Sequence, residues 1–341
     1  MRIVFLFLAS FVSIISYSQP KVHLLESGKK VSIRGLSAVS DQVVWISGSN
    51  GSVAKSVDGG ANWTWITVPG YEKRDFRDIE AFDKNTALIM AVAEPAVILK
   101  TRDGGQTWLK VFEDTTKGMF LDAMDFDASG KGMVIGDPIN GRTYLATTSD
   151  RGNSWEKENA WPSADFFNLH EGEAFFASSG TNISLAGKHP VIVSGGKSSR
   201  IFIQSKVNKW TALPITQGGE STGANSVAVN IGAHNGKAVV VGGDFAKDTI
   251  SSANCVLVTL STPPGFTIPK TPPHGYRSCV IYLDKKSLVT CGTSGVDIST
   301  DGGNNWQLIS RESFHVCRKA KKGTVVFLAG GGGRIAKLEN L

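Results

Sequence analysis

Apolar and polar residues alternate along short stretches of this chain, and turn-forming residues separate the stretches. Residues 32–40, 43–48, 52–56 and 63–68 form one such group of four. A period of two over short stretches is typical of strands. Similar groups begin near Phe76, Phe120, Glu171, Ser221, Tyr276 and Phe314. The pattern therefore predicts seven units, each with four antiparallel strands that we call a, b, c and d.

Four units share one turn, Ser/Thr-x-Asp-x-Gly-x-x-Trp, which is known as the Asp-box. The copies are residues 56–63, 101–108, 148–155 and 299–306, with Asp58, Asp103, Asp150 and Asp301 followed by Trp63, Trp108, Trp155 and Trp306. An Asp side chain can accept hydrogen bonds from the N–H groups of a tight turn, and Gly tolerates a positive φ. We therefore interpret these residues as structural: each box joins strands c and d, and its Trp packs between neighbouring sheets.

The spacing of the boxes predicts the fold. Their Asp residues lie 45, 47 and 151 positions apart, and repeats of about 40–50 residues are typical of propeller blades. The long interval leaves room for two degenerate repeats, with an eroded box at residues 204–210 and a matching strand at 255–259. The seventh unit ends after strand c, and residues 22–26 could supply its strand d, which would remove two exposed edges. The sequence predicts an all-β, seven-bladed propeller closed by its N-terminal strand.

The first 18 residues have the features of a secretory signal. Arg2 is followed by an apolar stretch over residues 3–15 and by Ser16-Tyr-Ser18, a small-x-small cleavage site before Gln19. The apolar stretch is shorter than a typical transmembrane helix. We therefore expect a signal peptide over residues 1–18 and one propeller domain over residues 19–341. The protein would be periplasmic or secreted, monomeric and without a membrane span.

Composition limits the partners. The net charge of +6 becomes +5 without Arg2, a modest surplus that favours acidic partners. The basic cluster 318–322 is interpreted as a solvated turn, and nucleic acid is not expected because a basic stripe with aromatic residues is missing. The four cysteines, Cys255, Cys279, Cys291 and Cys317, contain no C-x-x-C pair, so no metal site is expected. Cys279 and Cys291 fall opposite one another on strands a and b, where an oxidising compartment would permit a disulfide. We expect buried free thiols instead, because cross-strand bridges are strained.

The topology indicates which face could hold a site. The a–b turns and the boxes lie on one face, the box face, and the d–a connections and b–c loops lie on the other, the loop face. Arg34, Arg77 and Arg277 occupy matching positions on the loop face, where they could bind a carboxylate or another anionic group. The candidate acid–base groups there are Asp78, Asp122, Asp137, Glu173, Asp244 and His315. These groups could equally form a structural channel network in which arginines and carboxylates satisfy one another.

Several short motifs together resemble a known family. They are Arg-Gly-Leu at 34–36, Phe-Arg-Asp at 76–78, Gly-Asp-Pro at 136–138, Glu-Gly-Glu-Ala-Phe-Phe-Ala-Ser-Ser-Gly-Thr at 171–181, Val-Gly-Gly-Asp-Phe at 241–245 and Tyr-Arg-Ser at 276–278. With the boxes, they resemble exported bacterial Asp-box propellers related to the photosystem II stability/assembly factors. The resemblance covers the whole mature chain. It implies an assembly factor that holds a partner protein through an arginine-lined face, with Arg34, Arg77 and Arg277 in that role. The label "oxidoreductase" that such proteins often receive has no support here, because no Rossmann motif, flavin site or metal-ligand cluster is visible, and no cofactor is expected.

A second class of function is an enzyme that acts on acidic sugars. Asp-boxes also occur in sialidases and in other propellers that process glycosides, and sialidases hold a carboxylate with three arginines. The Arg-Ile-Pro motif of sialidases is absent, since Arg34, Arg77 and Arg277 are followed by Gly, Asp and Ser. A different glycoside hydrolase or lyase using the carboxylates above stays open. Two carboxyl groups about 5–9.5 Å apart beside an open pocket would favour it, whereas a shallow arginine-rich surface would favour a protein partner over an anionic glycan.

Overall fold

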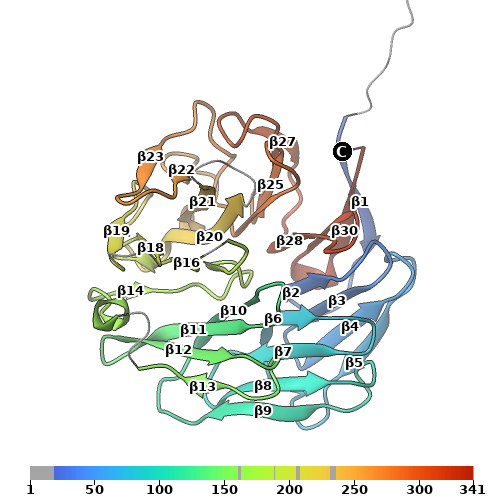
Figure 1. Cartoon of the computed structure of the whole chain (residues 1–341). Coiled ribbons are helices and arrows are strands. Elements are labelled where there is room, and N and C mark those ends of the chain that lie inside the picture. Colours follow the sequence, from blue (N-terminus) through green and yellow to red (C-terminus); the bar gives the residue numbers. More distant parts are fainter. Residues whose placement is uncertain (1–18, 160–162, 188, 205–207, 231–235, 341) are drawn as a thin grey trace, which may run out of the picture.

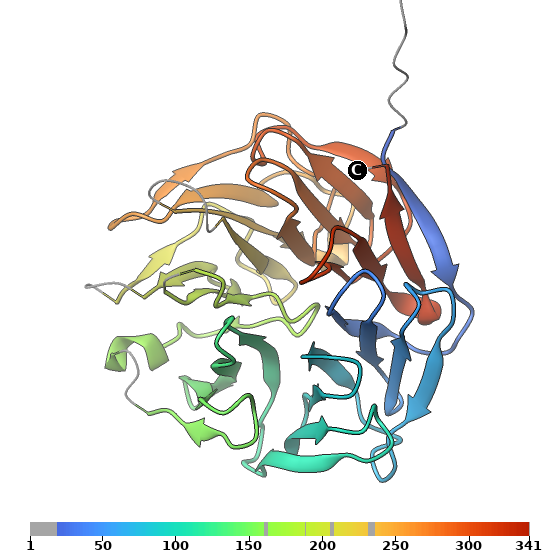
Figure 2. The ribbon, with the colours of Figure 1, turned by 45° about the vertical axis from the view of Figure 1, so that its right-hand side comes forward.

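Seven antiparallel sheets form a ring in the computed structural model of the chain (Figures 1 and 2), and we call the centre of this ring the channel. The structure describes residues 19–159, 163–187, 189–204, 208–230 and 236–340. The predicted signal peptide, residues 1–18, lies outside the described residues. Neighbouring inner strands pack against one another around the ring, as β2 against β6 and β20 against β24 do. The predicted seven-bladed, all-β architecture is confirmed.

The blades follow the order of the sequence. Blade 1 is β2 (Ile33–Ala38), β3 (Val44–Gly48), β4 (Ser52–Ser56) and β5 (Thr64–Thr67). Blade 2 is β6 (Phe76–Ala81), β7 (Ala87–Ala91), β8 (Ala96–Thr101) and β9 (Leu109–Asp114). Blade 3 is β10 (Leu121–Phe126), β11 (Gly132–Ile139), β12 (Arg142–Thr148) and β13 (Glu156–Lys157). Blade 4 is β15 (Ile183–Ser184), β16 (Val191–Val193), β18 (Arg200–Ile203) and β19 (Trp210–Ala212).

Blade 5 is β20 (Thr222–Asn230), β21 (Lys237–Asp244), β22 (Cys255–Thr259) and β23 (Gly265–Thr267), and β14 (Glu173–Ala174) and β17 (Gly195–Gly196) extend its sheet. Blade 6 is β24 (Cys279–Tyr282), β25 (Leu288–Gly292), β26 (Gly295–Ser299) and β27 (Gln307–Ser310). Blade 7 is β28 (Val316–Lys319), β29 (Val326–Ala329), β30 (Ile335–Glu339) and β1 (Lys21–Glu26). The 3-10 turns are η1 (Ala164–Phe167), η2 (Phe245–Lys247) and η3 (Gly331–Gly333). Among the described residues, no helix has the length and apolar character needed to cross a bilayer.

The ring closes as predicted, through the two ends of the chain. β1 pairs antiparallel with β30, with Lys21 opposite Glu339 and Leu24 opposite Ala336. Figure 1 shows this blue strand beside the red one. Blade 7 therefore obtains its outer strand from the N-terminal segment, and the aliphatic side chains of Val22 and Leu25 pack on the core between blades 7, 1 and 6.

The box turns are held by hydrogen bonds from their own side chains. In the first, the Ser56 hydroxyl donates to Asp58 Oδ1 (2.8 Å) and accepts from the N–H of Gly60 (2.9 Å). The N–H of Asn62 donates to Asp58 Oδ1 (2.9 Å). The side-chain amide of Asn62 donates to Asp58 Oδ2 (2.8 Å), and this bond, with the other two to Asp58, lowers the pKa of Asp58 to about 2. The indole of Trp63 donates to the carbonyl of Gly60 (3.1 Å), and Gly60 has a φ of +89°, which glycine adopts without strain.

The eroded box behaves differently, although residues 205–207 within it lie outside the described part of the chain. Trp210 begins β19, and its indole donates to the carbonyl of Phe166 in η1 (3.1 Å). The Phe166 and Trp210 rings stack with centroids 5.8 Å apart. Aromatic packing from η1 thus supports blade 4, where a box would otherwise fix the Trp. The other degenerate repeat was predicted at residues 255–259, which form β22 as expected.

The start of the fourth blade was predicted incorrectly. The fourth unit was expected to begin near Glu171, but its inner strand β15 begins at Ile183. The intervening residues 175–181, which we call the channel segment, run into the middle of the ring (Figure 2). There Ser178 lies against Asn225 of blade 5, Ser179 donates to the carbonyl of Ser278 (2.6 Å), and Gly180 approaches Asp78 of blade 2. Contacts with several blades at once hold this segment, and a local strand pattern cannot reveal them.

Candidate functional site

A β-bulge near the start of the inner strand occurs in four blades. The register shifts between Ile33 and Gly35, between Phe76 and Asp78, between Leu121 and Ala123, and between Ala224 and Ser226. The extra residues are Arg34, Arg77, Asp122 and Asn225. A bulge changes the direction of the extra residue's side chain. Two of these side chains contact the channel segment: Arg34 donates to the carbonyl of Ser178 (3.5 Å), and Asn225 accepts from the hydroxyl of Ser178 (3.0 Å).

Three arginines gather at the loop-face mouth of the channel: Arg34, Arg77 and Arg334, which we call the arginine cluster. Burial and the charge of Arg77 lower the pKa of Arg34. Burial and the charges of all three arginines lower the pKa of His315 to about 3. Besides burial, the lowered pKa of His315 thus reflects three arginines close to one ring.

Internal partners of the arginine cluster are few. Arg77 donates to Asp75 Oδ2 (2.7 Å), and about a third of each of these two side chains is exposed. Arg334 donates to the carbonyl of Ser313 (2.8 Å) and lies over the ring of Phe314. Among the described residues, neither Arg34 nor Arg334 forms an ion pair. The arginine cluster therefore has guanidinium groups left over for an external anion.

Arg334 was missed from the sequence, whereas Arg34 and Arg77 were predicted. It follows η3, in the glycine-rich b–c loop of blade 7. Gly333, with a φ of +66°, donates to the carbonyl of Val31 and brings this loop against blade 1. The signal available in the sequence was the position of Arg334 directly after the glycine run 330–333, which is typical of a turn.

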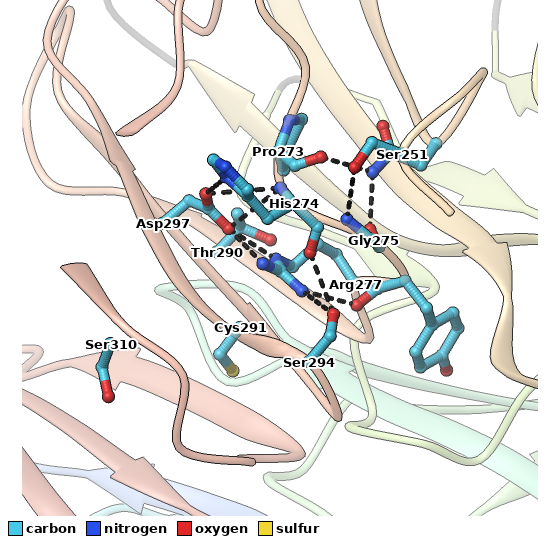
Figure 3. Close-up of polar contacts among 12 residues, drawn as sticks. Ser251, Pro273, His274, Gly275, Arg277, Thr290, Cys291, Ser294, Asp297 and Ser310 are labelled. Carbon is cyan, nitrogen blue, oxygen red and sulfur yellow. Dashed lines mark hydrogen bonds and ion pairs between the residues drawn. The ribbon is translucent and has the colours of Figure 1, made fainter. Parts of the chain in front are cut away.

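Arg277 does not join the arginine cluster, contrary to the prediction. Its side chain is 0% exposed. It donates to Asp297 Oδ2 through Nε (2.8 Å) and Nη2, to the carbonyl of Tyr276 (2.8 Å) and to the hydroxyl of Ser294 (2.7 Å) (Figure 3). His274 also contacts Asp297, through its backbone N–H and its ring Nδ1 (2.8 Å). Every hydrogen-bonding nitrogen of Arg277 is therefore used inside the protein, which is the structural alternative named from the sequence.

Three of the candidate acid–base groups lie inside the protein. Glu173 is buried, and its carboxylate accepts hydrogen bonds from both Nε (2.9 Å) and Nη2 (2.5 Å) of Arg200. Asp78 is buried and accepts from the N–H groups of Ile79 and Met124 (both 2.8 Å), and burial raises its pKa to about 8. Burial and the charge of Asp137 raise the pKa of Asp122 well above its usual range. The N–H groups of Asp137 and Ala177 lie beside Asp122 but do not meet hydrogen-bond geometry.

The other two candidate carboxylates lie at the loop-face ends of b strands, Asp137 in β11 and Asp244 in β21. Asp137 accepts from the N–H of Phe175 (2.9 Å), and burial raises its pKa to about 6. Asp244 Oδ1 accepts from the Ser221 hydroxyl (2.7 Å) and from the N–H of Ala246 (3.0 Å), so it caps η2. Through these bonds, both carboxylates hold neighbouring backbone segments in place. Among the described residues, no cluster of three or more His, Cys, Asp or Glu side chains could hold a metal ion.

Arg318 is not part of a solvated turn, which corrects the prediction for the cluster 318–322. Its guanidinium donates to the carbonyls of Ser179 (3.1 Å) and Cys317 (3.2 Å) and lies 3.4 Å from the sulfur of Cys279. It fixes the channel segment from the side of the box face. The cavity beside it, about 530 Å³, is lined by residues of β20, β24 and the channel segment, among others.

The four cysteines are buried free thiols. Cys279 and Cys291 lie opposite one another across β24 and β25, as the hairpin position predicted. Cys317 on β28 of the next blade also approaches, with its sulfur 3.7 Å from that of Cys279. The three thiols belong to the apolar core between blades 6, 7 and 1.

Sequence comparison relates the chain to one family. Residues 23–118 match the family model described as "Photosynthesis system II assembly factor YCF48". This chain is a β-propeller related to those assembly factors. The match covers blades 1 and 2 with β1, and so includes Arg34 and Arg77 but not Arg334. A comparison with the curated proteins gives no match to this assembly-factor-related propeller.

Solved structures show the same fold. A structure titled "YCF48 bound to D1 peptide" is 18% identical, with a TM-score of 0.62, and the alignment covers 95% of this chain and 97% of that one. "YCF48 from Cyanidioschyzon merolae" is 13% identical over 93% and 98% of the two chains, with a TM-score of 0.61. "Crystal structure of RRP9 WD40 repeats", 13% identical over 93% and 97%, reaches 0.63. Because a WD40 propeller scores as high, this likeness shows the fold alone.

Proposed function

We propose that this assembly-factor-related propeller is exported and holds a partner protein through an acidic segment that binds the arginine cluster on the loop face. The observation that carries the proposal is the set of three arginines around His315, of which only Arg77 has a carboxylate partner among the described residues. Planar guanidinium groups bind carboxylates with paired, charge-assisted hydrogen bonds. The structure titled "YCF48 bound to D1 peptide" supports the idea, since it is a peptide complex of a propeller with the same fold.

The electrostatics define how such binding should behave. His315 is neutral at physiological pH because its pKa lies near 3. The charge of the mouth therefore comes from guanidinium groups, which stay protonated at any physiological pH. Binding should weaken with salt, because Arg77 and Asp75 are partly exposed and screening acts on exposed charges. It should change little between about pH 6 and 9.

The experiment compares matched peptides. An array of acidic peptides, each paired with its Gln/Asn counterpart, is probed with the mature protein, and affinities of the best pairs are measured by fluorescence anisotropy. The variant R34Q/R77Q removes two charges from the arginine cluster. The control R102Q/K286Q removes two charges from exposed side chains on the box face.

We expect the acidic peptides to bind better than their amide counterparts, and R34Q/R77Q to lose this preference by about tenfold or more. R102Q/K286Q should keep it. Equal binding of the acidic and amide peptides, or equal loss in both variants, would overturn the proposal. A parallel panel of acidic and neutral glycans tests the enzymatic alternative: turnover that disappears in R34Q/R77Q at an unchanged Tm would establish an enzyme instead.

A further inference from the structure

Three aromatic side chains pack together on the loop face: Phe245 is exposed, Phe176 is partly buried and Tyr276 is buried. Phe245, the first residue of η2, is 50% exposed. Its ring packs edge-on against Phe176 of the channel segment and against Tyr276, with both centroid distances at 6.2 Å. We call Phe176, Phe245 and Tyr276 the aromatic ledge. A large apolar ring half in water, yet packed on two others, is a feature of protein contact surfaces.

The aromatic ledge is held rigidly in this position. Asp244 caps η2, and the N–H of Phe245 donates to the carbonyl of Ser221 (3.1 Å). The N–H of Tyr276 donates to the carbonyl of Asp248 (2.8 Å), which ties the same b–c connection to blade 6. Ile250, in this connection, is also 47% exposed. A fixed aromatic ring loses little conformational entropy when a partner covers it, and this favours its use in binding.

The aromatic ledge continues into the arginine cluster. The Tyr276 hydroxyl donates to Asn225 Oδ1 (2.8 Å), which also accepts from the hydroxyl of Ser178. Arg34 donates to the carbonyl of that same Ser178, and its charge lowers the pKa of Tyr276, although burial outweighs it. One strip across the channel mouth therefore offers cations at one end and an apolar ring at the other.

From this strip we infer the chemistry of the partner segment. It is an extended peptide in which an aromatic or branched aliphatic side chain packs on Phe245, while an acidic residue about three positions away reaches the arginine cluster. The inference rests on the proposed function, since it assigns a second contact to the same site. Charge complementarity selects this occupant: a purely apolar partner would leave the guanidinium groups of Arg34 and Arg334 without a counter-charge.

The test is a cycle of peptides and variants. Four labelled Gly-Ser peptides carry Phe or Ser at one position and, about three residues away, an Asp-Glu or an Asn-Gln pair, in both orders. Their affinities are measured for the mature protein, for F245S and for R34Q/R77Q. L109S is the matched control, because Leu109 is 62% exposed and lies on β9, the outer strand of blade 2.

We expect F245S to weaken the acidic Phe peptide by about tenfold to thirtyfold, to the level of the acidic Ser peptide, because truncating a central aromatic contact has an effect of this size. The acidic Ser peptide should bind F245S and the parent protein equally, and L109S should bind like the parent protein. Unchanged binding of the Phe peptide to F245S, with R34Q/R77Q still weakened, would overturn the aromatic ledge and leave the proposed function intact.

Two further outcomes also overturn the inference. If F245S weakens the Phe and Ser peptides equally, Phe245 supports the fold of the site and does not contact the partner. If F245S abolishes a self-association seen by sedimentation, the aromatic ledge covers a second copy of this chain. A parent protein that prefers no acidic peptide would refute the proposed function itself, together with the inference.

Discussion

The buried pair of Arg277 and Asp297 offers a sharp test of its structural role. Both side chains are 0% exposed. Replacing Arg277 with Ala removes the hydrogen bonds to Asp297, to Ser294 and to the carbonyl of Tyr276. Asp297 would keep only the two donors of His274. Breaking a buried ion pair from one side costs about 3–5 kcal/mol, because the remaining charge stays desolvated.

This cost should be visible in ordinary unfolding experiments. Unfolding entropy is about 2.1 cal/mol/K per residue, so for a chain of this size the loss corresponds to a decrease in Tm of about 4–8 °C. Chemical denaturation followed by circular dichroism would show a lower midpoint with an unchanged m-value if stability alone is affected. Peptide binding by the folded fraction should stay at the parental level, since Arg277 lies outside the arginine cluster.

The double variant R277M/D297L separates the explanations. Replacing both partners with apolar residues removes the desolvated charge, so the double variant should recover most of the stability lost in Arg277→Ala. A single variant as stable as the parent, or a double variant no better than the single one, would refute the reasoning. Loss of peptide binding at an unchanged Tm would assign Arg277 to the ligand, as the sequence first suggested.

Three other predictions follow from buried groups. Burial raises the pKa of Asp78 to about 8, so the native state keeps a proton that the unfolded chain releases near pH 4. The free energy of unfolding should therefore fall as pH rises from about 4 to about 8, by on the order of 5 kcal/mol from this group. D78N should flatten that slope in urea titrations. Gly180→Ala places a methyl group 2.2 Å from Asp78 Oδ2 at a φ of +65°, whereas Gly332→Ala has a similar φ of +68° and nothing within 4 Å. The second variant should lose only the left-handed backbone cost of about 1–2 kcal/mol in stability, and the first should lose clearly more. Equal losses would disprove a steric effect. All four cysteines are buried free thiols, so a thiol reagent should label none in the native protein and four after denaturation. Labelling of only two cysteines in the denatured, unreduced protein would reveal a disulfide.

The sequence predicted the fold well because the boxes are local devices. Residues that fix a turn by hydrogen bonds within eight positions leave their pattern in the chain, and their spacing then counts the blades. The start of the fourth blade was predicted incorrectly because the channel segment is held by distant partners such as Ser278. The degenerate turn of this blade is supported by packing between Phe166 and Trp210. Contacts of this kind depend on the closed ring and have no local period.

The site was predicted only in part, for a similar reason. Arg34 and Arg77 were identified because they open inner strands, and each proves to be the extra residue of a bulge. Arg277 has the same apparent position but meets Asp297, a partner on strand c. Arg334 comes from a b–c loop of another blade. Equivalent residues of a repeat occupy the same backbone position in each blade. The neighbouring side chains decide whether a charge at that position faces solvent or a buried counter-charge.

The pairing of β1 with β30 also has a kinetic consequence. Lys21 and Glu339 are neighbours in space but lie at opposite ends of the sequence. Because contacts between distant residues form slowly, the last blade should complete the ring late in folding. Until the C-terminal strand has been synthesised, β1 has no partner and blade 7 presents open edges that invite aggregation. An early strand thus waits for a much later one, and a variant that lacks β30 should be prone to aggregation even though blades 1 to 6 are intact.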